Sequence, residues 1–466
     1  MLTRKYGLLT VTMMAISATL GSSILIAFGQ VAYQAQYNPI LMLLAWIIGA
    51  ILIIPGLLLF AETTSSYPEN GTAYTWLKKA KFQATAFWFG WILVLLVAAT
   101  AIASATIACG NLIASLAAIT NPWLIKLIGI DVLVIMGLTH IYTKKIVGIS
   151  QTIFTVLKFI PILLVMILAI VYGSLANFEK PEVTKNLHQL FLTSYMLLPA
   201  MAMTMFAYSG IEAVTYVAGE IKEPRKNIIR AKIIAILVVV GVYVILAVAI
   251  ITINISNNLN AFSNNLWSEA ILSSKTIPHG FALAFNILSI VIFLGSLNAF
   301  LLYHSRMVHK LAQEHDLFNI FSKTNNPTNS PYLAIVLLML LSSVYVLWDQ
   351  LYSVVTYFII ATTVLQFIAF SVALKLRYQD STYKRMFNNF WYWVLFLSTI
   401  IGNILCLIGA IISMYVFARD SHDWWILYKC FIVCGVLVAG FPIYYIKEFT
   451  KKRMIINKQK QETLKQ

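Results

Sequence analysis

Twelve stretches of this 466-residue chain are apolar over about the 20 residues that a helix needs to cross a bilayer. They lie at residues 8–32, 40–62, 85–117, 123–142, 148–173, 191–218, 231–254, 280–304, 331–348, 352–375, 391–416 and 424–446. Only 11% of the residues are charged, against roughly a quarter in soluble proteins. The sequence therefore predicts an all-α membrane protein with twelve transmembrane helices, in a single domain over residues 1–447 with a basic tail at 448–466.

Positive charge gathers on one side of the predicted spans. The chain carries 33 Lys and Arg residues against 17 Asp and Glu, a net charge of +16. Most of the cations, Lys232 among them, fall in the loops and tail of one side, while Lys158 and Lys429 fall inside apolar runs. Because Lys and Arg accumulate on the cytoplasmic side, we expect both termini in the cytoplasm and the chain in the cell (inner) membrane. The charge thus indicates orientation in the lipid bilayer and no nucleic-acid partner.

Small residues interrupt two of the predicted spans. The first contains Ala-Thr-Leu-Gly-Ser-Ser-Ile at residues 18–24, and the sixth contains Phe-Ala-Tyr-Ser-Gly at residues 206–210. In hydrocarbon, a broken helix is tolerated only where the freed backbone groups line a cavity or are buried in protein. Interruptions at the first and sixth spans predict two inverted repeats of five spans, at about 8–173 and 191–375, and two extra helices at 391–446. Close packing of two helices through small side chains is the alternative.

Ionisable residues inside spans need an explanation, because each costs roughly 2.5–3.5 kcal/mol on insertion scales. Lys158 is a cation in the fifth span, and Glu212 follows the second interruption by two residues. Each is a candidate for proton or ion coupling, or a fixed internal counter-charge. We interpret Asp131 and His140, in the fourth span, as interior polar contacts without a transport role. Glu62 begins a stretch rich in charge and helix breakers that predicts a cytoplasmic loop up to Tyr74.

Four motifs occur in a fixed order along residues 6–445. They are Gly21-Ser22-Ser23-Ile24, Glu62 with Tyr67-Pro68-Glu69-Asn70-Gly71, Phe206 to Gly210, and Gly219-Glu220-Ile221-Lys222-Glu223-Pro224. In this order they resemble the amino acid-polyamine-organocation permeases, and among these the L-type exchangers and the fructoselysine-type bacterial permeases. The resemblance implies the fold of the sodium-coupled leucine transporter, with discontinuous helices 1 and 6. Ser23 departs from the family, which carries a second glycine at that position.

A helix that breaks at mid-membrane presents backbone groups with partial charge. If the first span runs outward, the N–H groups that open its second half should bind a substrate carboxylate. The carbonyl groups that end its first half, and those of the sixth span, should bind an ammonium group. Several helix ends must converge on a zwitterion, since each contributes only about 0.3–2 kcal/mol. The predicted substrate-binding residues of this α-amino acid site are Thr19, Gly21, Ser22, Ser23, Ile24, Phe206, Ala207, Ser209 and Gly210.

The resemblance also implies roles for single residues. Phe206 takes the place of an aromatic side chain that covers the substrate. Lys158 takes the place of a lysine that stands where sodium-dependent relatives bind the ion. Glu212 matches a glutamate proposed to sense protons in arginine/agmatine-type antiporters. Glu220 and Arg225 lie where the sixth span reaches the cytoplasm, which suggests an inner gate.

The predicted function is sodium-independent secondary transport of amino acids, by exchange or by proton coupling, through alternating access. A polyamine or amino-acid antiporter and an amino-sugar-conjugate permease are alternatives. A membrane enzyme would need convergent catalytic or metal-ligating groups, and none of the seven His residues pairs with another at ligand spacing on a span. A channel would be expected to carry charged rings or a carbonyl-lined filter. We therefore expect no cofactor and no metal, and as partners a small-molecule substrate, an amino acid, and the lipid bilayer.

Overall fold

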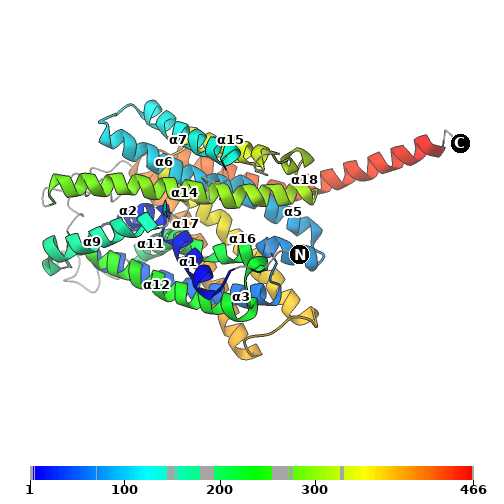
Figure 1. Cartoon of the computed structure of the whole chain (residues 1–466), viewed down its shortest axis with the longest axis horizontal. Helices are drawn as coiled ribbons and strands as arrows, with labels where there is room; N and C mark the ends of the chain where they lie inside the picture. Colours follow the sequence, from blue (N-terminus) through cyan, green and yellow to red (C-terminus); the bar gives the residue numbers. More distant parts are fainter. Residues whose placement is uncertain are drawn as a thin grey trace.

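The computed structural model describes residues 6–69, 71–143, 156–178, 194–253, 277–325 and 330–463, together with Arg4, Ile153, Phe154 and Ile271. Within these residues all regular structure is helical, and the only strand-like features are isolated bridges between single residues. Figure 1 shows a bundle in which α12 and α14 run along its length. The all-helical prediction is confirmed for the described part of the chain.

The α-helices are α1 (Leu8–Thr19), α2 (Ser22–Gln34), α3 (Pro39–Ser66), α4 (Thr72–Lys79), α5 (Gln83–Ile92), α6 (Ala99–Leu116), α7 (Pro122–Tyr142), α9 (Phe159–Tyr172), α11 (Leu197–Tyr208), α12 (Pro224–Thr252), α14 (His279–Gln313), α15 (Tyr332–Trp348), α16 (Leu351–Gln379), α17 (Asn389–Asp420) and α18 (Trp425–Thr463). One π-helical segment, η1 (Leu93–Ala98), joins α5 to α6. The 3₁₀ segments are η2 (Leu175–Phe178), η3 (Ser194–Met196), η4 (Ser209–Glu220) and η6 (Asn319–Ser322).

Eight of the described helical segments are long and apolar enough to cross a membrane, or nine if α1 and α2 count as one bent span. The helices α9 and α15 are apolar but shorter, at 14 and 17 residues. Residues 148–152 and 191–193 of the predicted fifth and sixth spans lie outside the described residues. The number of twelve spans therefore stays a prediction.

The helices differ in how much of their surface the bundle covers. In the most apolar 18 residues of the segment from Gln83 to Leu116, 94% of the residues are buried. The corresponding share is 28% for α7 and 22% for α18. Many exposed side chains of these outer helices are large and apolar, for example Ile135 and Phe431. Because soluble proteins rarely expose extended apolar faces, these helices are suited to contact with lipid.

Several sequence-based assignments need correction. Glu62 does not begin a loop, because α3 continues to Ser66 and buries it. Lys232 does not lie in a loop, because α12 begins at Pro224 and packs this side chain at 0% exposure. Asp131 is exposed on α7, so it is no interior contact. The interior position of His140 is confirmed, since its Nε2 lies 2.9 Å from Asn298 Oδ1 among buried residues.

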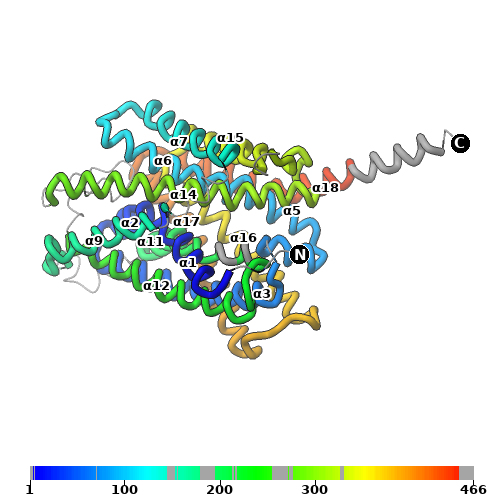
Figure 2. The backbone as a smooth tube through the Cα atoms, in the orientation of Figure 1, coloured from blue at the N-terminus to red at the C-terminus, as the bar shows by residue number. Residues whose placement is uncertain are grey.

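The C-terminal helix α18 extends beyond the last predicted span, as far as Thr463. It packs against α5 at one end of the bundle (Figures 1 and 2). Lys447 contacts the segment that follows α14, where its Nζ lies 3.4 Å from Asp316 Oδ1. Asp316 also accepts a hydrogen bond from the Tyr74 hydroxyl at 2.6 Å, and it pairs with Lys78 at 2.6 Å. This carboxylate therefore joins α4, the end of α14 and α18 at one end of the bundle.

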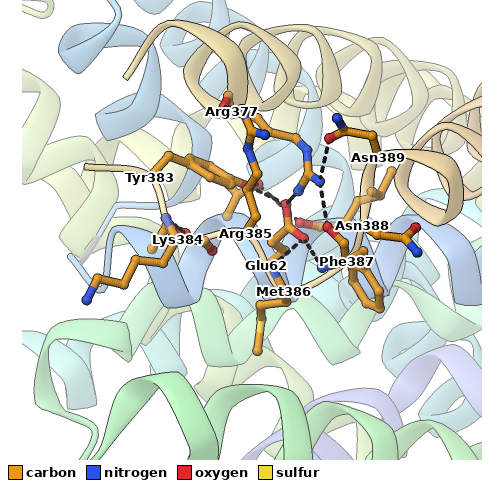
Figure 3. A network of polar contacts seen from close by, with 12 residues as sticks. Glu62, Arg377, Tyr383, Lys384, Arg385, Met386, Phe387, Asn388 and Asn389 are labelled. Atoms are coloured by element: carbon orange, nitrogen blue, oxygen red, sulfur yellow. Dashed lines mark hydrogen bonds and ion pairs between the residues drawn. The ribbon is translucent and has the colours of Figure 1, made fainter. Parts of the chain in front are cut away.

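A buried ion pair between Glu62 and Arg377 fixes the loop between α16 and α17 (Figure 3). Both side chains are 0% exposed. The Glu62 carboxylate also accepts hydrogen bonds from the Tyr383 hydroxyl at 3.0 Å and from the backbone N–H groups of Met386 and Phe387 at 3.0 and 2.9 Å. Arg377 in turn donates to the Phe387 carbonyl at 2.6 Å. Buried charges are stable only when paired and hydrogen-bonded in this way.

Replacement of Glu62 by Gln should destabilise the fold strongly, because it leaves the Arg377 guanidinium buried without a counter-charge. Loss of one partner of such a pair typically costs about 3–5 kcal/mol. Chemical denaturation of the detergent-purified protein, followed by tryptophan fluorescence, measures the change. The matched control is Glu69→Gln, which breaks a pair with Lys79 at 3.6 Å in which both side chains are exposed. That change should cost less than about 1 kcal/mol, and equal losses in the two variants would contradict the assignment.

Candidate functional site

The first interruption predicted from the sequence is a helix break. The helix α1 ends at Thr19, α2 begins at Ser22, and the two helices are bent by 43° relative to one another. The second interruption is a change of helix type, since α11 ends at Tyr208 and the 3₁₀ segment η4 begins at Ser209. A 3₁₀ segment of 12 residues is long, because its hydrogen bonds have poorer geometry than those of an α-helix. Both sites therefore leave backbone groups that the regular α-helical pattern does not pair.

The two breaks touch one another at Gly210. A Cβ atom at this position would lie 2.6 Å from the Thr19 Cα and would also clash with the Ala18 carbonyl group. Real Cβ atoms essentially never approach other atoms so closely, and here the neighbours are backbone atoms that no rotamer change can move. Only glycine therefore allows the start of η4 to pack against the end of α1.

Tyr243 of α12 connects the two breaks. Its hydroxyl group lies 2.9 Å from the Thr19 carbonyl oxygen and 3.0 Å from the Ala207 carbonyl oxygen, so one hydrogen is shared between two acceptors. The Thr19 carbonyl also accepts a hydrogen bond from the Ser23 hydroxyl at 3.0 Å. The side chain of Tyr243 is fully buried. Its hydroxyl thus provides partners for carbonyl groups that the predicted site assigned to a substrate ammonium group.

The N–H groups that open α2 have partners of their own. The Ser22 N–H donates to the Ser296 hydroxyl of α14 at 2.8 Å, and the Ile24 N–H donates to the Gly21 carbonyl at 3.2 Å. The Ser296 hydroxyl donates in turn to the Ile292 carbonyl at 3.1 Å. A hydroxyl oxygen therefore occupies the place at the start of α2 where the sequence predicts a carboxylate oxygen.

Lys158 lies between α1 and α14. Its Nζ is 3.4 Å from the Ser17 carbonyl oxygen, and it would lie 3.6 Å from a Cβ built on Gly21. A Cβ atom built on Gly295 would lie 3.2 Å from the Lys158 Cε. The residue is 3% exposed. A buried ammonium group therefore sits directly beside the first break, against a carbonyl that ends a helix.

A central cavity of about 110 Å³ adjoins both breaks. It is lined by residues at the breaks and on the helices that face them: Ala18, Val97, Ala101, Lys158, Ser209, Gly210, Glu212, Ser296, Ala299, Phe300, Tyr303, His304, Phe358 and Thr362. Pockets for drug-sized ligands measure roughly 300–1,000 Å³. The central cavity therefore suits only a small solute.

Glu212 stands at the junction of three cavities. It lines the central cavity and two smaller ones of about 50 and 10 Å³. Its Oε1 accepts a hydrogen bond from Gln366 Nε2 at 3.1 Å. Phe206 is placed differently, because it is buried with its ring edge-on to Phe358 at a centroid distance of 5.2 Å, and Phe358 rather than Phe206 lines the cavity.

A larger cavity, of about 400 Å³, lies at the junction of α6, α7 and α15. Neither helix break contributes to its wall, which is formed by the ends of helices. Its charged side chains already have partners within the protein. Lys126 Nζ donates to the Leu347 carbonyl at 2.8 Å, and Asp349 pairs with Lys429 at 3.5 Å. The convergence of two helix breaks distinguishes the central cavity, so we identify that cavity as the candidate functional site.

The predicted inner gate contains a backbone contact. The Tyr6 N–H donates to the Glu220 carbonyl at 3.0 Å, and the Lys222 N–H donates to the Tyr6 carbonyl at 2.9 Å. The N-terminal segment is thus paired with the end of η4 as a one-residue parallel bridge. Among the described residues, no ion pair joins Glu220 to Arg225. The gate role of these two side chains stays a prediction.

Three residues near the site were not selected from the sequence. Tyr243 and His304 lie on helices whose facing could not be read from their apolar sequences. Lys232 was counted as a loop cation, although it follows Pro224, which is a frequent first residue of a helix. That proline was the available signal that α12 begins early and carries Lys232 into the bundle.

Replacement of Gly210 by Ala should strongly slow solute exchange, because the added methyl group separates η4 from α1 where the central cavity begins. Solute exchange in proteoliposomes is expected to fall at least about tenfold, consistent with the sensitivity of packed sites to overpacking. The control is Gly241→Ala, since nothing lies within 4 Å of a Cβ at Gly241 on α12. Retained exchange in Gly210→Ala would show that the two breaks need not touch.

Replacement of Tyr243 by Phe keeps the ring and removes the hydroxyl that the Thr19 and Ala207 carbonyls share. Each carbonyl left unsatisfied in the interior costs about 1–3 kcal/mol, so the thermal midpoint in detergent should fall. The same change at Tyr142, which is 67% exposed at the end of α7, should leave the midpoint within error. A Tyr243→Phe variant as stable as the parent would rule out the bridging role.

Comparison with known proteins places the chain in a family. The family model described as amino acid permease matches residues 6–440. The serine/threonine exchanger SteT of Bacillus subtilis is 25% identical over 450 residues, which cover 95% of this chain and 97% of the exchanger. Solute carrier family 7 member 12 of mouse is 24% identical, covering 83% of this chain and 82% of its own. The gamma-aminobutyric acid permease of Escherichia coli is 23% identical, covering 70% and 69%. The chain belongs to the amino acid permease family.

Proposed function

We propose that this protein is a sodium-independent secondary transporter of amino acids that works by alternating access in the cell (inner) membrane. Its relatives are named as exchangers and permeases of amino acids, and the family match spans nearly the whole chain. The observation that carries the proposal is the meeting of two interrupted helices at a small cavity beside a buried lysine. A cavity for a small solute, walled by helix ends, is what binding of a zwitterion at mid-membrane requires.

The proposed architecture has twelve spans with both termini in the cytoplasm. Two inverted repeats, at about 8–173 and 191–375, precede two further helices at 391–446 and a basic tail at 448–466. Two interruptions support this arrangement. The first half has its break after α1, and the second half has its change to 3₁₀ structure after α11, so each half begins with an interrupted helix. The two halves would then rock against one another around the central cavity.

The substrate would be held mainly by backbone groups. Its carboxylate would take the place of the Ser296 hydroxyl on the Ser22 N–H, and the neighbouring N–H groups of Gly21, Ser23 and Ile24 would add to the positive end of α2. Its ammonium group would approach the carbonyl groups of Thr19 and of the residues from Phe206 to Gly210. The Thr19 carbonyl already accepts hydrogen bonds from the Tyr243 and Ser23 hydroxyls, so the ammonium group would take the place of one of these donors.

Lys158 would supply the positive charge that sodium supplies elsewhere. Its ammonium group lies against the Ser17 carbonyl and beside Gly21, so it can stabilise the negative end of α1 without a bound ion. Glu212, which also lines the cavity, is the second candidate for coupling. Counterflow with and without a pH gradient distinguishes exchange from proton symport. Saturable, stereoselective flux separates either of them from a channel, and the absence of product formation separates them from an enzyme.

Removal of the Lys158 ammonium group should stop transport. In proteoliposomes loaded with a mixture of amino acids, uptake of labelled serine by the parent protein should be equal in sodium and in choline buffer. The variant Lys158→Met should lose at least about tenfold in rate, because it leaves the carbonyl end of α1 without its cation. Strict dependence of the parent on sodium, or full activity of Lys158→Met, would reject the coupling role. The control is Lys226→Met, which removes an exposed lysine of α12.

A further inference from the structure

We propose that the cavity at the junction of α6, α7 and α15 binds the phosphate of a phospholipid headgroup from the surrounding bilayer. Its volume of about 400 Å³ is within the range of pockets for small ligands. It is separate from the central cavity, since no residue lines both. The inference therefore goes beyond the proposed function, and either of the two can fail without the other.

This helix-end cavity lies where apolar helices begin and end. Pro122 is the first residue of α7, Asp349 directly follows α15, and both line the cavity. Trp123, the next residue of α7, is 66% exposed. Tryptophan side chains at the ends of spanning helices typically lie at the level of the lipid headgroups. The cavity is therefore at the depth at which a bilayer carries its phosphate groups.

The two helices beside the cavity present apolar faces to the lipid. Figure 1 shows α7 and α15 side by side at the edge of the bundle. Large exposed apolar side chains occur on both helices within a few turns of the cavity: Leu124, Leu127, Ile135, Leu138, Leu340, Val344 and Leu347. The acyl chains of a lipid can lie along these faces while its headgroup enters the cavity. A water-soluble ligand gains nothing from such faces, so they favour a lipid.

Lys126 gives the cavity a positive charge that no carboxylate of the described residues pairs with. Its Nζ donates to the Leu347 carbonyl at 2.8 Å, which is a neutral acceptor, and lies 5.6 Å from the centroid of the Trp123 ring. An ammonium group has three N–H bonds, so two remain for other acceptors. The contact with Leu347 therefore caps the end of α15 without neutralising the lysine.

The acid on the cavity wall, Asp349, already has its partners. It is 3% exposed, and it accepts hydrogen bonds from the Tyr357 hydroxyl at 2.6 Å and from the Gln350 N–H at 2.9 Å. Lys429 of α18 lies 3.5 Å from the Asp349 carboxylate and compensates its charge. The charge that remains at the wall is that of Lys126. A phosphodiester, with one negative charge, complements it, as in other basic pockets between spanning helices.

Asn111 of α6 adds a second donor to the wall. It is 8% exposed, and its Nδ2 donates to no acceptor among the described residues. Buried amide groups nearly always have a partner, so this one points to an acceptor that a ligand supplies. The close packing of α6 on α7 brings Asn111 towards Lys126, because a Cβ built on Gly110 would lie only 2.9 Å from the Ile125 carbonyl oxygen. An amide and an ammonium group together suit a phosphate oxygen.

Native mass spectrometry of the detergent-purified full-length protein, titrated with phosphatidylglycerol, tests the inference. The parent protein should retain one lipid at least about tenfold more tightly than Lys126→Met, since a hydrogen bond to a charged group is lost. Lys126→Arg should bind nearly as well as the parent, because it keeps the charge. The matched control is Arg419→Met, which removes an exposed cation that pairs with Asp420 at the end of α17. It should leave the affinity unchanged.

A second variant separates lipid binding from stability. Asn111→Leu keeps the approximate size of the side chain and removes an unpaired amide, so the thermal midpoint in lipid-free detergent should not fall. Its affinity for phosphatidylglycerol should fall about fivefold. A lower midpoint together with the affinity of the parent would show that Asn111 serves packing only, and would contradict the inference.

Three further probes distinguish a lipid from other sources of the same oxyanion. Diacylglycerol has the acyl chains without the phosphate and should not be retained. Inorganic phosphate and glycerol phosphate have the oxyanion without the chains and should not displace phosphatidylglycerol. Retention of diacylglycerol as tight as that of phosphatidylglycerol would show that the phosphate is not recognised. Displacement by the free phosphates, or equal lipid affinity in Lys126→Met, would likewise overturn the inference.

Discussion

The need to pair backbone carbonyl groups inside the bundle underlies the structure around the central cavity. Hydrocarbon offers such groups no partner, so every interruption of a spanning helix has to be compensated by protein atoms. The Tyr243 hydroxyl does so for both interruptions at once, and Gly210 allows them to come close enough for one side chain to serve both. The cavity exists beside this contact because the helix ends, unlike continuous helices, present polar groups.

Buried charges in this protein are of two kinds. Glu62 and Arg377 are paired with one another and hydrogen-bonded to neighbouring groups, and they join α3 to the loop before α17. Lys158 and Glu212 have fewer contacts and line the wall of the central cavity. A fully paired charge stabilises one arrangement of helices, whereas a partly paired charge on a cavity wall can interact with a solute. The second kind is what a transport site needs.

Much of the site could be predicted because it depends on residue types that hydrocarbon strongly restricts. Runs of small residues at 18–24 and 206–210 indicated the two interruptions, and the cost of burying charge singled out Lys158 and Glu212. The order of the motifs then indicated the family, which the comparison confirmed over residues 6–440. These features are local in the chain, so neither the facing of a helix nor the identity of its neighbours was needed to find them.

Residue types and their order along the chain are enough to predict a helical, apolar protein with two interrupted segments and with Lys158 and Glu212 inside spans. Which side chains meet at the interruptions depends on how the helices pack. Asp131, expected inside, is exposed on α7, while Lys232, expected in a loop, lies in the interior. The physical reason is that transmembrane helices are apolar on every face, so their sequence carries little amphipathic signal of which face packs inward. The partners of Tyr243 and the burial of Lys232 depend on that facing, and packing alone sets it.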